Sequence, residues 1–187
     1  EGEGLGVVLA LIGAEPERDG QGKIFRYRLI PLEQLGRARI DVLLDVSSIF
    51  RDTFQMTLDL LDELFRLAAT VDEPRDSNFI KAHTDDLLAD GRSLDEATAR
   101  IFTQAPGLYG TGVDELIEES QWEESAELAS MYEKRNAYTA GGKRNGAAAP
   151  ATLKNLLGKV DHVFQAIDSV EYGLTDMTHY YGHSGAI

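Results

Sequence analysis

The sequence predicts a mixed α/β fold, in which a short, mainly parallel sheet in the N-terminal part is followed by a predominantly helical layer. Three observations support this prediction. Residues 7–12 and 40–46 are short apolar runs, typical of strands that are buried on both faces. Residues 24–30 alternate between apolar and polar side chains, as a half-buried strand does. From residue 52 onward, apolar residues recur at helical spacing instead.

The three predicted strands are joined by short connections. Residues 15–22 are rich in turn-forming residues, and residues 31–36 form a second connector. The third strand ends in the polar turn 47–52, which opens directly into a long helix. Because ligands in open α/β sheets collect beyond the carboxyl ends of strands, this turn is the first place where a site is expected.

Capping residues and apolar spacing predict the helices that follow. Asp52 and Gln55 form a candidate capping box for a helix whose apolar positions continue to Ala68, and Pro74 ends it or starts the next. Further helices are expected over residues 77–88, from Ser93 through Ile101, over 113–118, from Ser120 through Arg135, and from Thr152 through Ile167.

The chain is expected to divide into three parts. Residues 1–140 form the α/β-to-helical core segment, residues 141–150 form a flexible linker rich in Gly and Ala, and residues 151–187 add a helix and an aromatic tail to the same domain. The chain lacks an initiator Met and enters an apolar run almost at once. We therefore expect a fragment of a longer polypeptide.

Composition excludes several classes of function. The chain has 187 residues and a formal net charge of -14, which argues against a nucleic-acid or anionic-membrane surface. No stretch approaches the roughly 18 apolar residues that span a bilayer, and no signal peptide is visible. The absence of Cys removes disulfides, thiolate nucleophiles and sulfur ligands. A cytoplasmic globular protein fits best.

Histidines provide few metal-ligand patterns. His179 and His183 are spaced to share one face of a helix, but Gly182 lies between them and no H-E-x-x-H motif exists, so a stable zinc site is not expected. A transient metal contact at His179 stays open, beside a capping or interface role. His83 is expected at the surface or the edge of the core, and His162 is expected to be structural.

Other candidate groups also have structural interpretations. Asp52, Asp72 and Glu73 lie at predicted helix ends, and Asp52 is most simply a helix N-cap. Arg51 could hold a substrate carboxylate, or could form an ion pair with Asp72 or Glu73. The glycine-rich loop 106–112 matches neither nucleotide-binding glycine pattern, which favours a tight turn over a phosphate site. Aromatic residues could line a flat macrocycle or form core; they are Phe102, Tyr109, Trp122, Tyr132 and Tyr138.

A series of ordered motifs resembles one family. The run Ser47-Ser-Ile-Phe-Arg-Asp52 resembles the segment S-G-I-F-R-D in the large subunits of magnesium chelatase and cobaltochelatase, the CobN-like family. Further elements follow in the family's order and cover nearly the whole chain: Gly13-Ala-Glu-Pro16, Leu29 to Gly36, Asp72-Glu-Pro74, Asn78 to His83, Arg100-Ile-Phe102, Pro106 to Gly112, Trp122-Glu-Glu124 and Met131-Tyr132. The chain resembles part of the C-terminal half of such a subunit.

The resemblance implies ATP-dependent insertion of Mg²⁺ into protoporphyrin IX, with the metal and the porphyrin as substrates. Residues 164–181 resemble the magnesium branch more closely. The alternatives are a cobaltochelatase that acts on a corrin ring, a non-catalytic tetrapyrrole-binding module and a purely structural segment. Separate AAA+ partner subunits would use the ATP, which agrees with the lack of a P-loop motif. The resemblance also allows the plastid stroma of a phototrophic eukaryote as a location.

The implied reaction requires that Mg²⁺ lose its water and that two pyrrole protons be accepted, and carboxylates and imidazoles suit both tasks. The candidate catalytic residues are His179, His83, Glu73 and Asp52. His179 or Glu73 would be the transient Mg²⁺ ligand. The candidate substrate-binding residues are Arg51, as a propionate clamp, with Tyr109 and Trp122.

Overall fold

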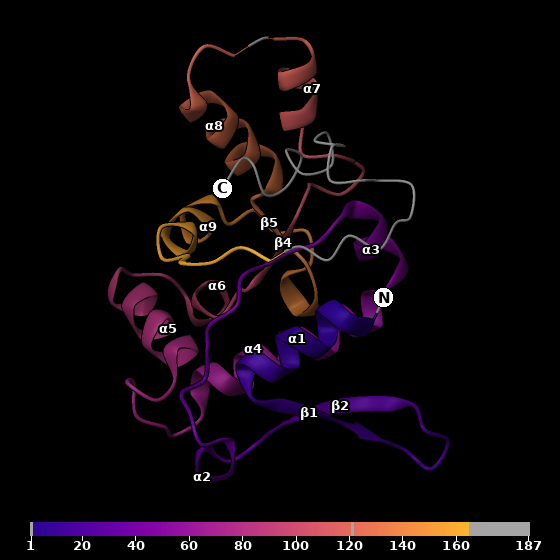
Figure 1. Cartoon of the computed structure of the whole chain (residues 1–187), viewed down its shortest axis with the longest axis vertical. Helices are drawn as coiled ribbons and strands as arrows, with labels where there is room; N and C mark the ends of the chain where they lie inside the picture. The colour runs from indigo at the N-terminus through magenta and orange to yellow at the C-terminus, as the bar shows by residue number, and fades with distance from the viewer. Residues whose placement is uncertain (1, 121, 165–187) are drawn as a thin grey trace.

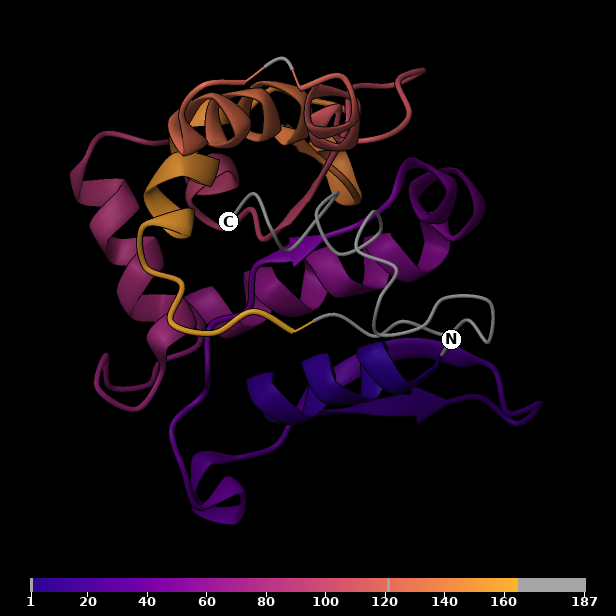
Figure 2. The same cartoon turned by 45° about the horizontal axis from the view of Figure 1, so that its top comes forward.

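A computed structural model describes residues 2–120 and 122–164 (Figure 1). The N-terminal layer consists of helix α1 (Gly2–Ile12), the antiparallel hairpin of β1 (Ala14–Arg18) and β2 (Ile24–Leu29), and the short helix α2 (Leu32–Leu35). Helix α1 lies beside the hairpin in both views (Figures 1 and 2). The long helix α4 (Gln55–Thr70) also contacts β2, so two helices cover this hairpin.

A second, three-stranded sheet lies at the centre of the fold. It contains β3 (Leu44–Asp45), β4 (Ile101–Thr103) and β5 (Tyr138–Thr139) in that order. Strand β3 pairs with β4 in parallel, and β4 pairs with β5 in the antiparallel direction. The bonds from Leu44 N to the Arg100 carbonyl (2.8 Å) and from Val46 N to the Phe102 carbonyl (2.9 Å) hold the chain after residue 40 against β4.

Helices surround this small sheet. In addition to α4, they are α3 (Ser48–Thr53), α5 (Phe79–Ala89), α6 (Leu94–Ala97), α7 (Val113–Glu118), α8 (Ser125–Asn136), α9 (Pro150–Leu157) and the 3-10 turn Gly142–Arg144. Helices α7 and α8 lie at the end of the molecule opposite the β1–β2 hairpin (Figure 1).

The main core forms around α4. Leu58, Leu61, Leu64 and Phe65 are buried on this helix at the spacing that the sequence predicts. They belong to one apolar cluster with Ile12 of α1. A second cluster joins Leu87, Phe102, Leu153 and Leu156, so α5, β4 and α9 share a separate core. The mixed α/β class is confirmed.

The prediction of a strand over residues 7–12 is wrong, because these residues belong to helix α1. A continuous apolar run is compatible with a buried strand or a helix, and its periodicity cannot separate the two. In the structure, Val8, Leu9 and Ile12 are buried while Val7 is partly exposed, which is a helical pattern. The helix ends at Gly13, whose φ of 77° is readily available only to glycine.

Strand pairing also differs from the predicted mainly parallel sheet. The β1–β2 and β4–β5 pairs are antiparallel, and part of the predicted turn 15–22 is strand β1. Only the end of the predicted strand 40–46 is β3. The helix predicted from Ser93 through Ile101 is too long: α6 ends at Ala97, and Ile101 begins strand β4.

Helix starts are predicted well where a cap is local. The capping box of Ser93 and Glu96 is present, and α7 matches its predicted range. The Ser120 capping box is wrong, since α8 begins at Ser125. The predicted helix from Thr152 also differs: it begins at Pro150 and ends at Leu157, and its expected end at Ile167 lies outside the described residues.

Residues 141–150, for which the sequence predicts a flexible linker, make several contacts with the rest of the fold. The amide of Gly142 donates to Asp59 Oδ1 of α4 at 2.8 Å. The amide of Thr139 donates to the Ala147 carbonyl at 2.9 Å. Gly141 has a φ of 84°, and a Cβ at this position would lie 2.5 Å from the Leu58 carbonyl oxygen.

The Gly141→Ala substitution is therefore expected to destabilise the chain by about 2–4 kcal/mol, because backbone strain adds to the contact with α4. Urea denaturation followed by circular dichroism would measure the change. Gly22→Ala is the matched control: its φ is 82°, but nothing lies within 4 Å of the added Cβ. A loss at Gly141 no larger than that at Gly22 would contradict the packing of this segment against α4.

Candidate functional site

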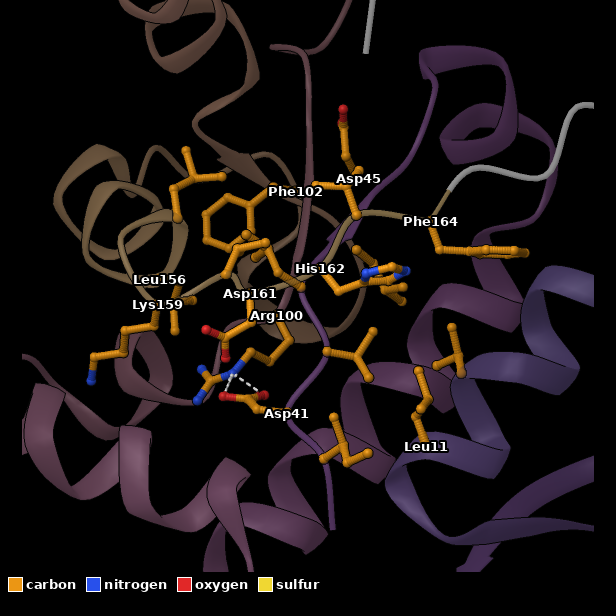
Figure 3. A pocket seen from close by; sticks show the side chains of 18 of the residues that line it. Leu11, Asp41, Asp45, Arg100, Phe102, Leu156, Lys159, Asp161, His162 and Phe164 are labelled. Carbon is orange, nitrogen blue, oxygen red and sulfur yellow. Dashed lines mark hydrogen bonds and ion pairs between the residues drawn. The ribbon is translucent and has the colours of Figure 1, made fainter. Parts of the chain in front are cut away.

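A cavity of about 830 Å³ lies between α1, the chain around β3, α9 and residues 159–164 (Figure 3). Its wall is mainly apolar and includes Val8, Leu11, Val42, Phe102, Leu153 and Leu156. The volume falls within the range of small-molecule sites, roughly 300–1,000 Å³. Ionisable groups interrupt the apolar wall, as in sites that orient a ligand; they are Asp41, Asp45, His83, Arg100, Tyr132, Lys159, Asp161 and His162.

One group of charged side chains in this wall is built around Asp41. Arg100 Nε donates to both carboxylate oxygens of Asp41, at 2.8 Å and 3.0 Å (Figure 3). His83 Nδ1 lies 2.8 Å from Asp41 Oδ2. Asp41 comes from the chain before β3, His83 from α5, and Arg100 from the residue before β4. Three segments far apart in sequence therefore meet at one carboxylate.

Arg100 is a fixed anchor for this group. Its side chain is fully buried. Besides Asp41, its guanidinium donates to the carbonyls of Ala97 (2.8 Å), Ala99 (2.9 Å) and Ile80 (3.3 Å), and to Thr84 Oγ1 (3.2 Å). These bonds join α5 to the turn after α6. Asp41 supplies the negative charge that this buried cation needs.

The surroundings keep Asp41 ionised. Burial by itself would raise the pKa of this carboxyl group, but the charge of Arg100 and the hydrogen bond with His83 outweigh it. The net effect holds the pKa of Asp41 below its ordinary value. Asp41 is therefore an anion at neutral pH and accepts, rather than donates, the hydrogen bond with His83.

The orientation of His83 follows from this bond. Because Asp41 accepts, Nδ1 of His83 carries the proton, and in the neutral ring Nε2 carries the lone pair. Within residues 2–120 and 122–164, no hydrogen bond involves Nε2. The ring also stacks on Phe79, with 6.5 Å between ring centroids. His83 and Phe79 both line the cavity. An oriented imidazole at an apolar cavity can accept a proton or contact a metal ion.

Another part of the cavity wall contains Tyr132 and Asp45. Burial raises the pKa of the Tyr132 phenol well above its ordinary value, and the charge and hydrogen bond of Asp45 add to this effect. Tyr132 is therefore a neutral hydrogen-bonding group at any physiological pH. His162, which the sequence predicts to be structural, also lines the cavity.

The structure brings together Arg51, Asp52 and Tyr109. None of these three residues lines the cavity. Arg51 Nε donates to Asp52 Oδ1 at 2.7 Å, and the Tyr109 hydroxyl donates to Asp52 Oδ2 at 3.0 Å. The hydrogen bond from Arg51, followed by that from Tyr109, lowers the pKa of Asp52. Arg51 is buried and also donates to the Gln104 carbonyl at 2.7 Å. These bonds attach the glycine-rich loop to α3.

Two sequence-based interpretations of this region are wrong. Asp52 is not the N-cap of the long helix: it lies within α3, whose own cap is Ser47, and α4 has Phe54 at its N-cap with no side-chain cap bond. The expected ion pair of Arg51 with Asp72 or Glu73 is replaced by the pair with Asp52.

Glu73 is held by a different arginine. Arg39 Nε and Nη2 donate to its two carboxylate oxygens at 2.8 Å and 2.7 Å, and Asn78 Nδ2 donates to Oε2 at 2.9 Å. Arg39 is 1% exposed and also donates to the Ile12, Gly13 and Ile30 carbonyls. Glu73 therefore balances a buried cation that connects α1, the hairpin and α5.

Trp122 is 39% exposed and, like Glu73, is outside the described cavity lining. His179 lies outside the described residues. Of the described candidates for a catalytic or substrate-binding role, His83 lies at the cavity; of the aromatic residues that could line a macrocycle, Phe102 and Tyr132 also line it. Sequence reasoning missed Asp41 and Arg100 as members of the site. The available signal was Asp41, one of two aspartates in the largely apolar run 40–46, because a buried charge needs a partner.

Two further findings concern only residues 2–120 and 122–164. In that part of the chain, no group of three or more His, Asp or Glu side chains is arranged to hold a metal ion. No helix there is long and apolar enough to cross a membrane.

Comparison with known proteins extends over the whole chain. The family model described as CobN/Magnesium Chelatase matches residues 1–187. The magnesium-chelatase H subunit of Chlorobaculum parvum is 48% identical over 187 residues, which cover 100% of this chain and 15% of that protein. The aerobic cobaltochelatase CobN subunit of Sinorhizobium sp is 34% identical over 194 residues, again with 100% of this chain and 15% of the relative.

A solved structure shows the same fold. The catalytic subunit of cobaltochelatase from Mycobacterium tuberculosis matches with a TM-score of 0.77 and 34% identity, over 80% of this chain and 13% of that one. The chain thus spans about 15% of the length of the curated relatives that it matches.

Proposed function

Because this chain belongs to the CobN/magnesium chelatase family, we propose that it is part of the porphyrin-binding large subunit of an ATP-dependent magnesium chelatase. The whole protein would insert Mg²⁺ into protoporphyrin IX. The observation that carries this proposal is the apolar cavity with an oriented histidine in its wall, in a chain that matches the family from end to end.

The cavity suits a tetrapyrrole in two respects. A porphyrin is a flat, largely apolar ring, and the cavity wall combines aliphatic side chains with the aromatic rings of Phe79, Phe102, Tyr132 and Phe164. The wall also contains polar groups, among them the hydrogen-bonded Asp41, His83 and Arg100, which can orient a ring. Residues of the full subunit beyond this chain would complete the enclosure.

The chemistry assigned to this chain is proton acceptance. Metal insertion requires that pyrrole N–H protons leave, and His83 Nε2 is an imidazole nitrogen at the cavity wall. The same nitrogen could contact the incoming Mg²⁺ transiently, although carboxylates and water are its preferred ligands. Separate AAA+ subunits would hydrolyse the ATP, as the resemblance to the chelatase family implies. His179 stays a second proton-acceptor candidate from the sequence.

One observation favours a second candidate function. The solved structure that matches with a TM-score of 0.77 is a cobaltochelatase subunit, so the fold also accommodates insertion of cobalt into a corrin ring. The higher identity to a magnesium-chelatase subunit, 48% against 34%, favours the magnesium branch. Competition between protoporphyrin IX and a corrin substrate for the same site would separate the two functions.

The Val7→Trp substitution is expected to weaken porphyrin binding by tenfold or more, because an indole at this position of α1 would fill part of the cavity. The measurement is quenching of protein fluorescence by a soluble porphyrin, in the full natural protein that contains residues 1–187. Ala10→Trp is the matched control on the same helix, since Ala10 is exposed and is not part of the described lining. Equal affinities for the two variants would contradict the location of the site.

A non-catalytic tetrapyrrole-binding module would give the same binding result but no metal insertion. The insertion assay, with the AAA+ subunits, ATP and Mg²⁺, therefore has to accompany the binding measurement. Binding without insertion by the unaltered complex would favour that module over the proposed enzyme.

A further inference from the structure

We propose that Asp41 is a positioning residue for His83 in the metal-insertion step, and that Arg100 fixes Asp41 in place. This inference rests on the proposed function, because it assigns a role to the proton-acceptor histidine of the same cavity. In this proposal Asp41 acts through the imidazole, to which its carboxylate is hydrogen-bonded.

The geometry gives Asp41 a fixed direction. Its carboxylate accepts from Arg100 through both oxygens and from His83 through Oδ2. Only about a tenth of its side chain is exposed. A carboxylate with three such bonds has little rotamer freedom, so its lone pairs define where the His83 ring can lie.

The anchor is rigid on the side of α5 as well. Arg100 donates to the Ile80 carbonyl and Thr84 Oγ1, which come from the same helix as His83. Asp41 is thus fixed relative to the backbone that carries the imidazole. The imidazole ring of His83 also stacks on Phe79, which limits the rotation of the imidazole about its side-chain bonds. The arrangement is more than an ion pair, because all of its members act on the orientation of one ring.

The proposed step is a proton transfer. A pyrrole N–H bond breaks, its electron pair stays on the ring nitrogen, and the proton forms a bond with His83 Nε2. The pyrrole nitrogen is then able to bind the metal, and the imidazolium later releases its proton to water. The negative charge of Asp41 at Nδ1 stabilises this imidazolium and holds the productive tautomer. Asp41 thereby affects the insertion rate rather than the affinity for the ring.

The test uses the full natural protein with its AAA+ subunits, and compares porphyrin affinity with insertion rate. Asp41→Glu keeps an anion for Arg100 but moves the carboxylate by one methylene. We expect an unchanged porphyrin Kd, within about twofold, and an insertion rate lowered by about 10–100-fold. In a His83→Ala background the same change should have no further effect, since both residues act in one step.

The outcomes separate the two proposals. A His83→Ala variant with full activity would refute the role of His83 and thus the premise. If His83→Ala is inactive while Asp41→Glu keeps its rate, only the inference about Asp41 is wrong. An equal loss from Asp41→Glu with and without His83 would show that Asp41 acts only through the fold.

A second measurement leaves Asp41 unaltered and so avoids any folding defect. Added imidazole should partly restore insertion in His83→Ala, because it can donate to Asp41 with one nitrogen and accept a proton with the other. We expect 1-methylimidazole, which has no N–H to donate to Asp41, to restore at least fivefold less. Equal rescue by the two bases would overturn the inference.

Discussion

Replacing Glu73 by alanine is expected to lower the free energy of unfolding by about 3–5 kcal/mol, because it leaves a buried cation without its counter-ion. Arg39 is 1% exposed and pairs with Glu73 through both carboxylate oxygens. Its other donors reach backbone carbonyls, which carry no compensating charge. The loss would be measured by urea denaturation of the chain. It would also show that the carboxylate is needed for stability, which is the role that its contacts indicate.

A matched control is available on the β1–β2 hairpin. Glu15 pairs with Arg28, but the two side chains are 47% and 50% exposed. Glu15→Ala should therefore cost about 1 kcal/mol or less. If Glu73→Ala were equally mild, the Arg39–Glu73 pair could not be an important contact between the first layer and α5.

The pH dependence of stability provides an independent check of the same pair. The hydrogen bonds from Arg39 hold the pKa of Glu73 below its ordinary value of 4.5, although burial acts in the opposite direction. Because the pKa is lower in the folded state, the pair contributes its full stability above pH 4.5, and this contribution is lost as the pH falls through the folded pKa. The Glu73→Gln variant should lack this component of the acid sensitivity.

Local patterns predicted much of the helical layer. The Ser93 capping box and the apolar spacing of α4 involve residues within a few positions of one another, so a single sequence contains the necessary information. Helix α1 could not be predicted in this way, because its apolar run is compatible with two structures and tertiary contacts decide between them. The short strands were predicted poorly for the same reason, because tertiary contacts decide them: β3 and β4 pair across more than fifty residues of chain.

The candidate site shows the same difference between local patterns, which a sequence reveals, and long-range contacts, which it does not. His83 was a candidate by residue type, and the structure places it at the cavity. An aspartate in the run 40–46 indicated that a partner was needed, but the sequence does not show which residues meet, since Asp41 lies 42 residues from His83 and Arg100 lies 59 residues from Asp41. Position at helix ends made Glu73 and Asp52 candidates, but position does not reveal which cation each carboxylate meets. Arg39 and Arg51 pair with those carboxylates, so of the candidate catalytic residues in the described part of the chain only His83 lies in the cavity wall.

The substitution His83→Asn is expected to reduce metal insertion by at least about 100-fold, because it removes the proton-accepting nitrogen from the cavity wall. Asparagine is suited to this test since its side-chain NH₂ can take the place of Nδ1–H and donate to Asp41. The partner contacts of Asp41 and Arg100 would then persist, and the melting temperature should change little. Insertion would be measured by the fluorescence of the metallated ring in the complete, ATP-supplied complex.

Porphyrin affinity distinguishes a chemical role of His83 from a binding role. If the imidazole acts on the pyrrole protons, the Kd of His83→Asn stays within about twofold of the unaltered protein while the rate falls, because only the transition state loses an interaction. His162 is the second histidine in the described cavity wall, and His162→Asn should reduce the rate by less. A larger loss at His162 than at His83 would move the proton-accepting role to the other histidine. It would also remove the proposed positioning role of Asp41, since no hydrogen bond joins Asp41 or Arg100 to His162 within the described part of the chain.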